Sequence, residues 1–293
     1  MKEMKTFHPL IIALYFIGCI GFSMFSMNPI YLSISLLMAI IINVKLTSII
    51  SFKRIIFLVI LFVLVCMIIN AMFVHQGFTI LFFMNDNPIT LESIIFGLSF
   101  ALMISATLIW FKNLSLIMDS DKVVYLLGRI SPLLAFIISL VLRYIPYLQD
   151  YYHKIKDFHK INYDIKNRNL FDKLKSSIHC FLALVSFAFE NSLDSVNSIN
   201  SLGYGSRKRT NYHLYHFEKR DLFALVLLFI CMGLTIFIYF YHNLSFYYYP
   251  KIAIVSLDSL SIISYMMFLL FLILPLIFEI EEEIRWRLSI SKI

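Results

Sequence analysis

The chain has 293 residues, of which 60% are hydrophobic and 15% are charged, and its formal net charge is +7. Its mean hydropathy of +0.82 lies far outside the range of soluble globular domains, so the composition excludes a soluble enzyme or binding module. It indicates an integral membrane protein. Several apolar runs approach the roughly 20 residues that a helix needs to cross a bilayer core of about 30 Å, and helices are therefore the expected spanning elements.

Apolar segments follow one another along the chain and predict helices. They are residues 9–27, 30–44, 55–74, 93–111, 132–148, 222–242 and 252–278. The first follows Lys2 and Lys5, but no small-residue cleavage site comes after it, which favours a spanning helix over a signal peptide. We expect the first two segments to form a tight hairpin through Asn28-Pro29.

Residues 149–220 differ from the rest because they are rich in Lys, Asp, Asn, Ser and His. Within them, apolar residues recur at mostly three- and four-residue steps, which predicts an amphipathic helix with a polar opposite face. The apolar positions are Leu174, Ile178, Phe181, Val185, Ala188, Val196 and Ile199.

Basic residues predict the orientation, because cytoplasmic loops of membrane proteins carry an excess of Lys and Arg. If both termini and residues 112–220 are cytoplasmic, 24 of the 25 basic residues lie inside, and residues 75–91 and 243–251 lie outside. The expected parts are N-terminal membrane helices at 1–118, a cytoplasmic coupling-helix module at 119–220, and C-terminal membrane helices with a cytoplasmic tail at 221–293.

The segment 132–148 is ambiguous. It is apolar enough to span, but a crossing there would export the basic stretch from Lys154 to Arg220. We therefore expect a helix that lies in or dips into the cytoplasmic leaflet, broken at Pro132 and Pro146, with Arg143 reaching the headgroups. The resulting architecture is all-α with six spanning helices, four before the cytoplasmic region and two after it.

Little in the chain suggests catalysis. The cysteines Cys19, Cys66, Cys180 and Cys231 have no metal-ligand spacing and are interpreted as small core hydrophobes. No histidines have a zinc-binding spacing, no phosphate loop is found, and no charged residue falls at membrane depth where an ion path would place one. We expect no catalytic residue, no metal site and no cofactor on this chain. The alternative functions are a self-contained carrier or channel and a membrane-embedded enzyme.

Three stretches, in order, carry a resemblance to a known family. They are "LESIIFGLSFALMISATLIWF", "SPLLAFIISLVLRYIPYLQDYYHKIKDFHK" and "SINSLGYGSRKRTNYHLYHFEKRD", and His8-Pro9 also fits. Together they resemble the transmembrane T component of energy-coupling factor (ECF) transporters, the family of the cobalt and biotin transporter membrane subunits. The likeness runs through about residues 91–221.

The resemblance implies a scaffold subunit of an ATP-binding-cassette importer in a bacterial or archaeal cell membrane. Two partner ATPases, which carry ATP and Mg, would bind this subunit, and it would hold a small membrane S component that recognises a vitamin or a metal ion. No nucleic acid is expected among the partners. In this family two coupling helices each end in a small-Arg-Gly motif that contacts the ATPases.

Here the aligned positions depart from that motif, since both arginines are replaced. They read Ile161-Asn162-Tyr163 and Ser201-Leu202-Gly203. Neighbouring cations could supply the charge: Lys160 on the first helix, and Arg207, Lys208 and Arg209 after the second. A simpler alternative is that this basic turn holds anionic lipid headgroups.

The stretch "SLGYGSRKRTNY" has a physical interpretation of its own. An amphipathic helix ending at Ser201-Leu202 can be stopped by Gly203, which tolerates the left-handed conformation of a helix C-cap, while Gly205 lets the backbone turn again. The basic residues that follow favour the negative end of the helix dipole. Tyr204 offers a rigid aromatic contact.

Overall fold

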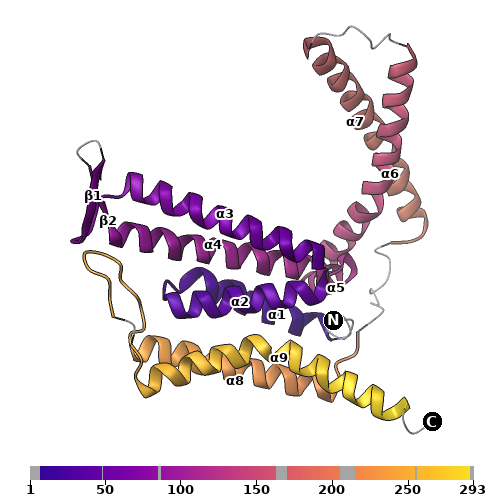
Figure 1. The fold of residues 1–293 in the computed structure, drawn as a ribbon. Coiled ribbons are helices and arrows are strands. Elements are labelled where there is room, and N and C mark those ends of the chain that lie inside the picture. The colour runs from indigo at the N-terminus through magenta and orange to yellow at the C-terminus, as the bar shows by residue number, and fades with distance from the viewer. Residues whose placement is uncertain are drawn as a thin grey trace. The chain divides into compact units, whose positions relative to one another are not determined.

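The structure is a computed structural model that describes residues 7–47, 49–84, 87–162, 170–204, 215–254 and 256–290. Figure 1 shows that helices make up most of it. The described elements are α1 (Pro9–Phe25), α2 (Pro29–Leu46), α3 (Ile49–Phe73), β1 (Ile80–Met84), β2 (Asn87–Thr90), α4 (Leu91–Ile117), α5 (Ser120–Ile130), α6 (Pro132–Asn162), α7 (Leu170–Ser201), α8 (Lys219–Tyr241) and α9 (Ser259–Ile290). The predicted helical membrane class is confirmed. The antiparallel hairpin of β1 and β2 is an addition that the sequence analysis did not foresee.

The chain divides into two compact units. One unit consists of Met1–Asp119 together with Tyr215–Ile293, and the other is Ser120–Leu214. The first therefore contains α1–α4, the hairpin, α8 and α9, and the second contains α5–α7. The three functional parts expected from the sequence stay a prediction.

Among the described residues, 6 helices are long and apolar enough to cross a membrane: α2, α3, α4, α6, α8 and α9. The number agrees with the prediction, but the membership differs. Helix α1 has 17 residues, at the short end of the range for spanning helices, whereas α6 qualifies by length and composition. Whether 132–148 crosses the bilayer or lies in one leaflet stays a prediction.

The turn between α1 and α2 is short, and both helices begin with the same local signal. His8 and Asn28 are N-caps, and each is followed by a proline at the first helical position. Asn28 Oδ1 accepts a hydrogen bond from the Ile30 N–H at 3.0 Å, and its Nδ2 donates to the Leu244 carbonyl at 3.2 Å. The predicted hairpin through Asn28-Pro29 is confirmed, and its turn is also tied to the loop after α8.

The core of the larger unit is aromatic and contains buried polar contacts. Trp110 of α4 is fully buried, and its ring centroid lies 6.0 Å from those of Tyr15 and Phe16. Its Nε1–H donates to Ser35 Oγ at 2.9 Å, and Ser35 Oγ lies 2.6 Å from Ser23 Oγ. Because lipid tails are as apolar as the helices, close packing and interhelical hydrogen bonds of this kind hold α1, α2 and α4 together.

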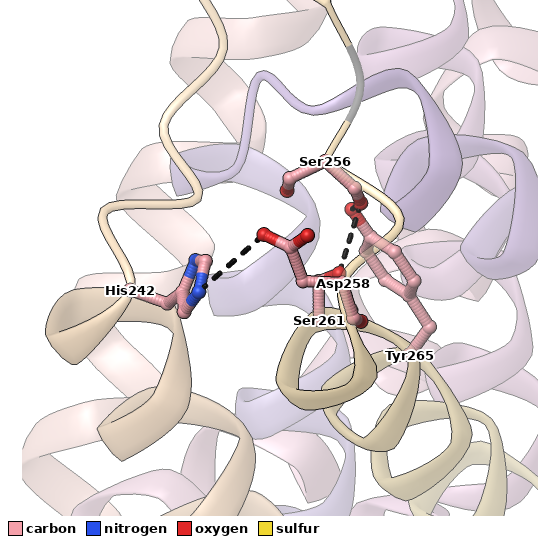
Figure 2. Close-up of polar contacts among 5 residues, drawn as sticks. All are labelled: His242, Ser256, Asp258, Ser261 and Tyr265. Carbon is pink, nitrogen blue, oxygen red and sulfur yellow. Dashed lines mark hydrogen bonds and ion pairs between the residues drawn. The ribbon is translucent and has the colours of Figure 1, made fainter.

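Helix α9 begins later than its predicted segment, at Ser259 instead of residue 252. Figure 2 shows the polar contacts at this start. The Ser261 hydroxyl lies 2.7 Å from the Asp258 carbonyl and 2.9 Å from the Ser256 carbonyl and shares its one proton between them, while the Asp258 carbonyl also accepts the first helical bond, from the Ile262 N–H at 3.0 Å. The Asp258 carboxylate also lies 3.7 Å from His242 Nε2, at the end of α8. The predicted segment began too early because it was based only on the apolar character of the sequence from residue 252.

Candidate functional site

Helices α6 and α7 form an antiparallel pair that is held by aromatic contacts. The rings of Tyr151 and Phe187 stack with centroids 3.4 Å apart, and Tyr147 also contacts Phe187, at 5.7 Å. The hydroxyls of Tyr144 and Ser195 form a hydrogen bond. Later residues of α6 thus meet earlier residues of α7.

The C-terminal end of α7 is a well-defined cap. The Gly203 N–H donates to the Asn200 carbonyl (2.9 Å) and the Tyr204 N–H donates to the Ile199 carbonyl (3.2 Å), while Gly203 has φ 75°. These two bonds and the left-handed residue define a Schellman motif, so the cap predicted at Gly203 is confirmed. Its part in binding a partner stays a prediction.

At this cap the Tyr204 side chain packs on α6, whereas the Leu202 side chain is exposed. The Tyr204 ring stacks on Phe136 of α6, with centroids 4.6 Å apart and an interplanar angle of 22°. Ser201 Oγ donates to the Asn197 carbonyl at 2.8 Å. Leu202 is 87% exposed. The cap therefore presents an apolar side chain on a backbone that its hydrogen bonds hold in place.

The other predicted contact lies at the end of α6. The backbone of Lys160, Ile161 and Asn162 forms the last turn of this helix. The remaining predicted site residues lie outside the described residues; they are Tyr163, Gly205, Arg207, Lys208 and Arg209.

The two predicted contact ends lie at opposite ends of the helix pair. Tyr204 meets Phe136, near the start of α6, whereas Lys160 is in its last turn. Lys160 comes 24 positions after Phe136, which corresponds to about 36 Å of helix at 1.5 Å per residue. The two predicted contact ends are therefore far apart along the helix pair and do not form one combined site.

The predicted break at Pro146 is wrong. Helix α6 continues through Pro146, although proline removes one backbone hydrogen bond. Packing against α7 explains the continuity, because Tyr144 and Tyr151 contact α7 on either side of the proline. Pro132 is the first residue of α6 and does begin the helix, and Arg143 is exposed on it.

Only part of the apolar face predicted for α7 is covered: Val185, Ala188 and Ile199 are half-buried. Leu174, Ile178, Phe181 and Val196 are between 53% and 63% exposed, whereas the α6-facing side carries Phe187 and Ser195. The tyrosines of α6 favour a mixed polar and aromatic surface, since their hydroxyls need hydrogen-bond partners. An apolar stripe on α7 is left uncovered within the described residues.

A buried carboxylate escaped the sequence analysis. Glu92, in the first turn of α4, is 2% exposed and accepts hydrogen bonds from Thr79 Oγ1 (2.7 Å) and from the backbone N–H groups of Phe78 (3.3 Å) and Thr79 (3.2 Å). Gly77 has φ 143°, and a Cβ there would lie 2.6 Å from Glu92 Oε2. Thr90 as N-cap with an acid in the first turn is a recognisable helix start. The donors from the preceding loop are long-range contacts, and no local pattern announces them.

Two polar side chains of the described residues, Glu92 and Ser261, are engaged in structural contacts. No group of three His, Cys, Asp or Glu side chains in this part of the chain could hold a metal ion. Glu92 is enclosed by hydrogen-bond donors, and in Figure 2 the Ser261 hydroxyl is engaged with backbone carbonyls. Cys19, Cys180 and Cys231 are buried free thiols, as predicted for small core residues, whereas Cys66 is only partly buried.

Comparison with known proteins adds one finding. A family model, CbiQ, described as a cobalt transport protein, matches residues 4–212. The match includes α1 to α7 and both predicted contact ends. No curated protein matches the chain.

Proposed function

Because that match covers more than half of its length, the chain belongs to the CbiQ cobalt transport protein family, and we propose that it is the T component of an ECF-type importer. In this role it is a multi-pass membrane scaffold that links two ATP-binding-cassette ATPases to a small substrate-binding S component. The reaction at the ATPases would use ATP and Mg, and this chain would bind no cofactor. The imported solute is a vitamin or a metal ion.

The observation that carries the proposal is the pair of separated ends on α6 and α7. A scaffold that engages two ATPases needs two attachment points on one rigid element, and the stacked and hydrogen-bonded helix pair supplies them. Leu202 is well suited to one such point, because an apolar side chain on an ordered cap can enter a pocket at little cost in conformational entropy.

The second attachment point is the last turn of α6, Lys160 to Asn162, followed by Tyr163. In place of the family's arginines, Lys160 would provide charge at this end, and Arg207, Lys208 and Arg209 would provide it beside Leu202. Their contribution would be mainly steering, since charges at the rim of an interface affect association and salt dependence more than affinity. Both termini and residues 112–220 would be cytoplasmic.

The test is affinity purification of the tagged full chain from its native membrane, with identification of the proteins that accompany it. We expect ATP-binding-cassette ATPases and one small, very hydrophobic membrane protein. Liposomes containing only this chain should neither take up solute nor hydrolyse ATP. Solute uptake by the chain alone would instead establish the alternative, a self-contained carrier or channel. Labelling of a cysteine at position 165 from outside intact cells would overturn the orientation.

A further inference from the structure

Helices α3 and α4 lie side by side (Figure 1) and leave a groove between them. The groove has a volume of about 490 Å³, within the roughly 300–1,000 Å³ typical of ligand sites. Its α3 wall includes Ile55, Leu58 and Val65, and its α4 wall includes Ser105, Leu108 and Lys112. It is apolar along its length and basic at one end.

The groove is as long as one leaflet of a bilayer is deep. From Ile55 to Val65 the helix rises by about 15 Å, which is half of a hydrocarbon core of about 30 Å. Both walls belong to helices that are long and apolar enough to span, and only 11% of the α3 span is buried. A single extended acyl chain from one leaflet would match this length and this surface.

Cations gather where the groove reaches the end of the span. The helices are antiparallel: a Cβ at Gly97 of α4 would meet Cys66 and Met67 of α3, and Ile55 and Lys112 border the same groove. Lys53 and Arg54 immediately precede Ile55, so they lie at the level of Lys112. All three cations are exposed. The one carboxylate of α3 and α4, Glu92, is at the other end of α4, and the first acid after Lys112 is Asp119, beyond the end of α4.

We propose that the α3–α4 groove is a binding site for one anionic phospholipid. The acyl chain lies against Leu58, Val65 and Leu108, and the phosphate meets Lys53, Arg54 and Lys112. A basic pocket between spanning helices at headgroup depth is the chemistry that holds anionic headgroups. A zwitterionic lipid would fill the groove equally well but would gain less from the cations.

Native mass spectrometry of the full chain tests the proposal. The protein in detergent is mixed with equal amounts of phosphatidylglycerol and phosphatidylcholine bearing the same palmitoyl and oleoyl chains. We expect one retained phosphatidylglycerol in preference to phosphatidylcholine. Lys112→Gln should reduce this preference by about 5-fold, the effect of one cation near an anionic surface. The Lys53→Gln/Arg54→Gln/Lys112→Gln variant should bind both lipids alike.

Matched variants separate the groove from the general surface. Leu108→Trp fills the groove at a side chain that is already 60% exposed, and it should reduce retention of both lipids. Ile60→Trp, at a 54% exposed side chain of α3 outside the groove lining, should leave retention unchanged, as should Lys251→Gln. Glycerol phosphate, which has the headgroup charge but no acyl chain, should not compete.

Three results would overturn the proposal. The first is equal retention of the two lipids by the unaltered protein. The second is a phosphatidylglycerol preference that survives the triple substitution or is lost equally in Ile60→Trp. The third is a cross-link from Leu108→Cys to another membrane protein in native membranes, which would assign the groove to a helix of a partner.

Discussion

The two units differ in where they place their apolar side chains. In the larger unit half of the α9 span is buried, and Trp110 is completely enclosed. In the smaller unit only 6% of the α6 span is buried, and Leu202 is 87% exposed. The larger unit has a core of its own, although only 11% of its α3 span is buried, whereas α6 and α7 keep much of their apolar surface uncovered. Apolar side chains of this chain therefore fall into two groups: those that pack inside the protein and those that are exposed to lipid or to other molecules.

Two helix ends with the same cap show the difference at the level of single residues. Like Gly203 after α7, Asn243 after α8 is left-handed, with φ 48°, and the Leu244 N–H donates to the Tyr239 carbonyl at 3.0 Å. Leu244 is 3% exposed, while Tyr204, the equivalent residue after α7, is 45% exposed. The cap conformation depends on residues close in sequence, whereas the burial of the residue that follows the cap depends on packing with the rest of the fold.

The largest expected effect is on the enclosed core. Trp110→Ala removes a fully buried indole and the hydrogen bond to Ser35, and should lower the free energy of unfolding by about 3–5 kcal/mol. Phe189→Ala, at a 69% exposed ring of α7, is the matched control and should change it by less than about 0.5 kcal/mol. Thermal unfolding of the purified chain, followed by labelling of the buried Cys19, measures both. Equal losses of stability in the two variants would contradict the view that the larger unit has a packed core while α7 carries exposed apolar side chains.

The next effect is on partner binding and not on folding. Leu202→Asp should leave the unfolding temperature unchanged, because the side chain is exposed in the free protein. If Leu202 enters a pocket on an ATPase, however, an unpaired carboxylate there costs at least about 2 kcal/mol, or roughly 30-fold in affinity. Pull-down of the ATPases with the tagged variant measures the loss.

The basic residues after α7 provide the control for that experiment. Neutralising Arg207, Lys208 or Arg209 one at a time should each cost about 1 kcal/mol or less, and high salt should reduce the difference. The opposite ranking, with normal binding by Leu202→Asp and release on neutralisation, would make the docking electrostatic.

A smaller effect is expected from the cap itself. Gly203→Ala places a Cβ on a left-handed residue and should cost about 1–2 kcal/mol, felt as fraying of the last turn of α7. Gly203→Asn should be better tolerated, since Asn243 adopts the same conformation at the end of α8. Hydrogen exchange of the Tyr204 amide reports the fraying. Equal protection in both variants would show that the cap does not depend on glycine.

Much of the fold follows from local rules. The bilayer requires long apolar helices, so α2, α4 and α8 appear close to their predicted segments. Short-range signals likewise announced the turn at Asn28-Pro29 and the cap at Gly203. Pro146 shows where local rules stop, because its penalty is outweighed by contacts with residues more than thirty positions away.

The sequence predicted where the candidate site lies along the chain, but not which side chains contact one another there. The periodicity of α7 showed that Phe181 and Val196 share a face, but it could not say which face α6 would cover. That choice depends on tyrosines of α6, whose partners Phe187 and Ser195 are set by tertiary packing. The roles of Lys160 and Leu202 depend on partner proteins. The only sequence evidence for these roles is that the residues replace or adjoin the arginines of the family motif.

The smallest expected effect comes from the polar pair drawn in Figure 2. His242 Nε2 and Asp258 Oδ2 are 3.7 Å apart, and the Asp258 side chain is 69% exposed. Exposed pairs of this kind contribute between nothing and about 1 kcal/mol, so Asp258→Asn should barely change the unfolding temperature. The attraction is electrostatic, so any effect should shrink further in high salt. The reference is the buried pair of Asn43 and Asn113, in which Asn43 Nδ2 donates to Asn113 Oδ1 at 2.6 Å. Asn113→Ala should lower the free energy of unfolding by about 1–2 kcal/mol. A larger loss in Asp258→Asn than in Asn113→Ala, measured side by side, would mean that the connection between α8 and α9 contributes more to stability than the polar contacts inside the membrane core.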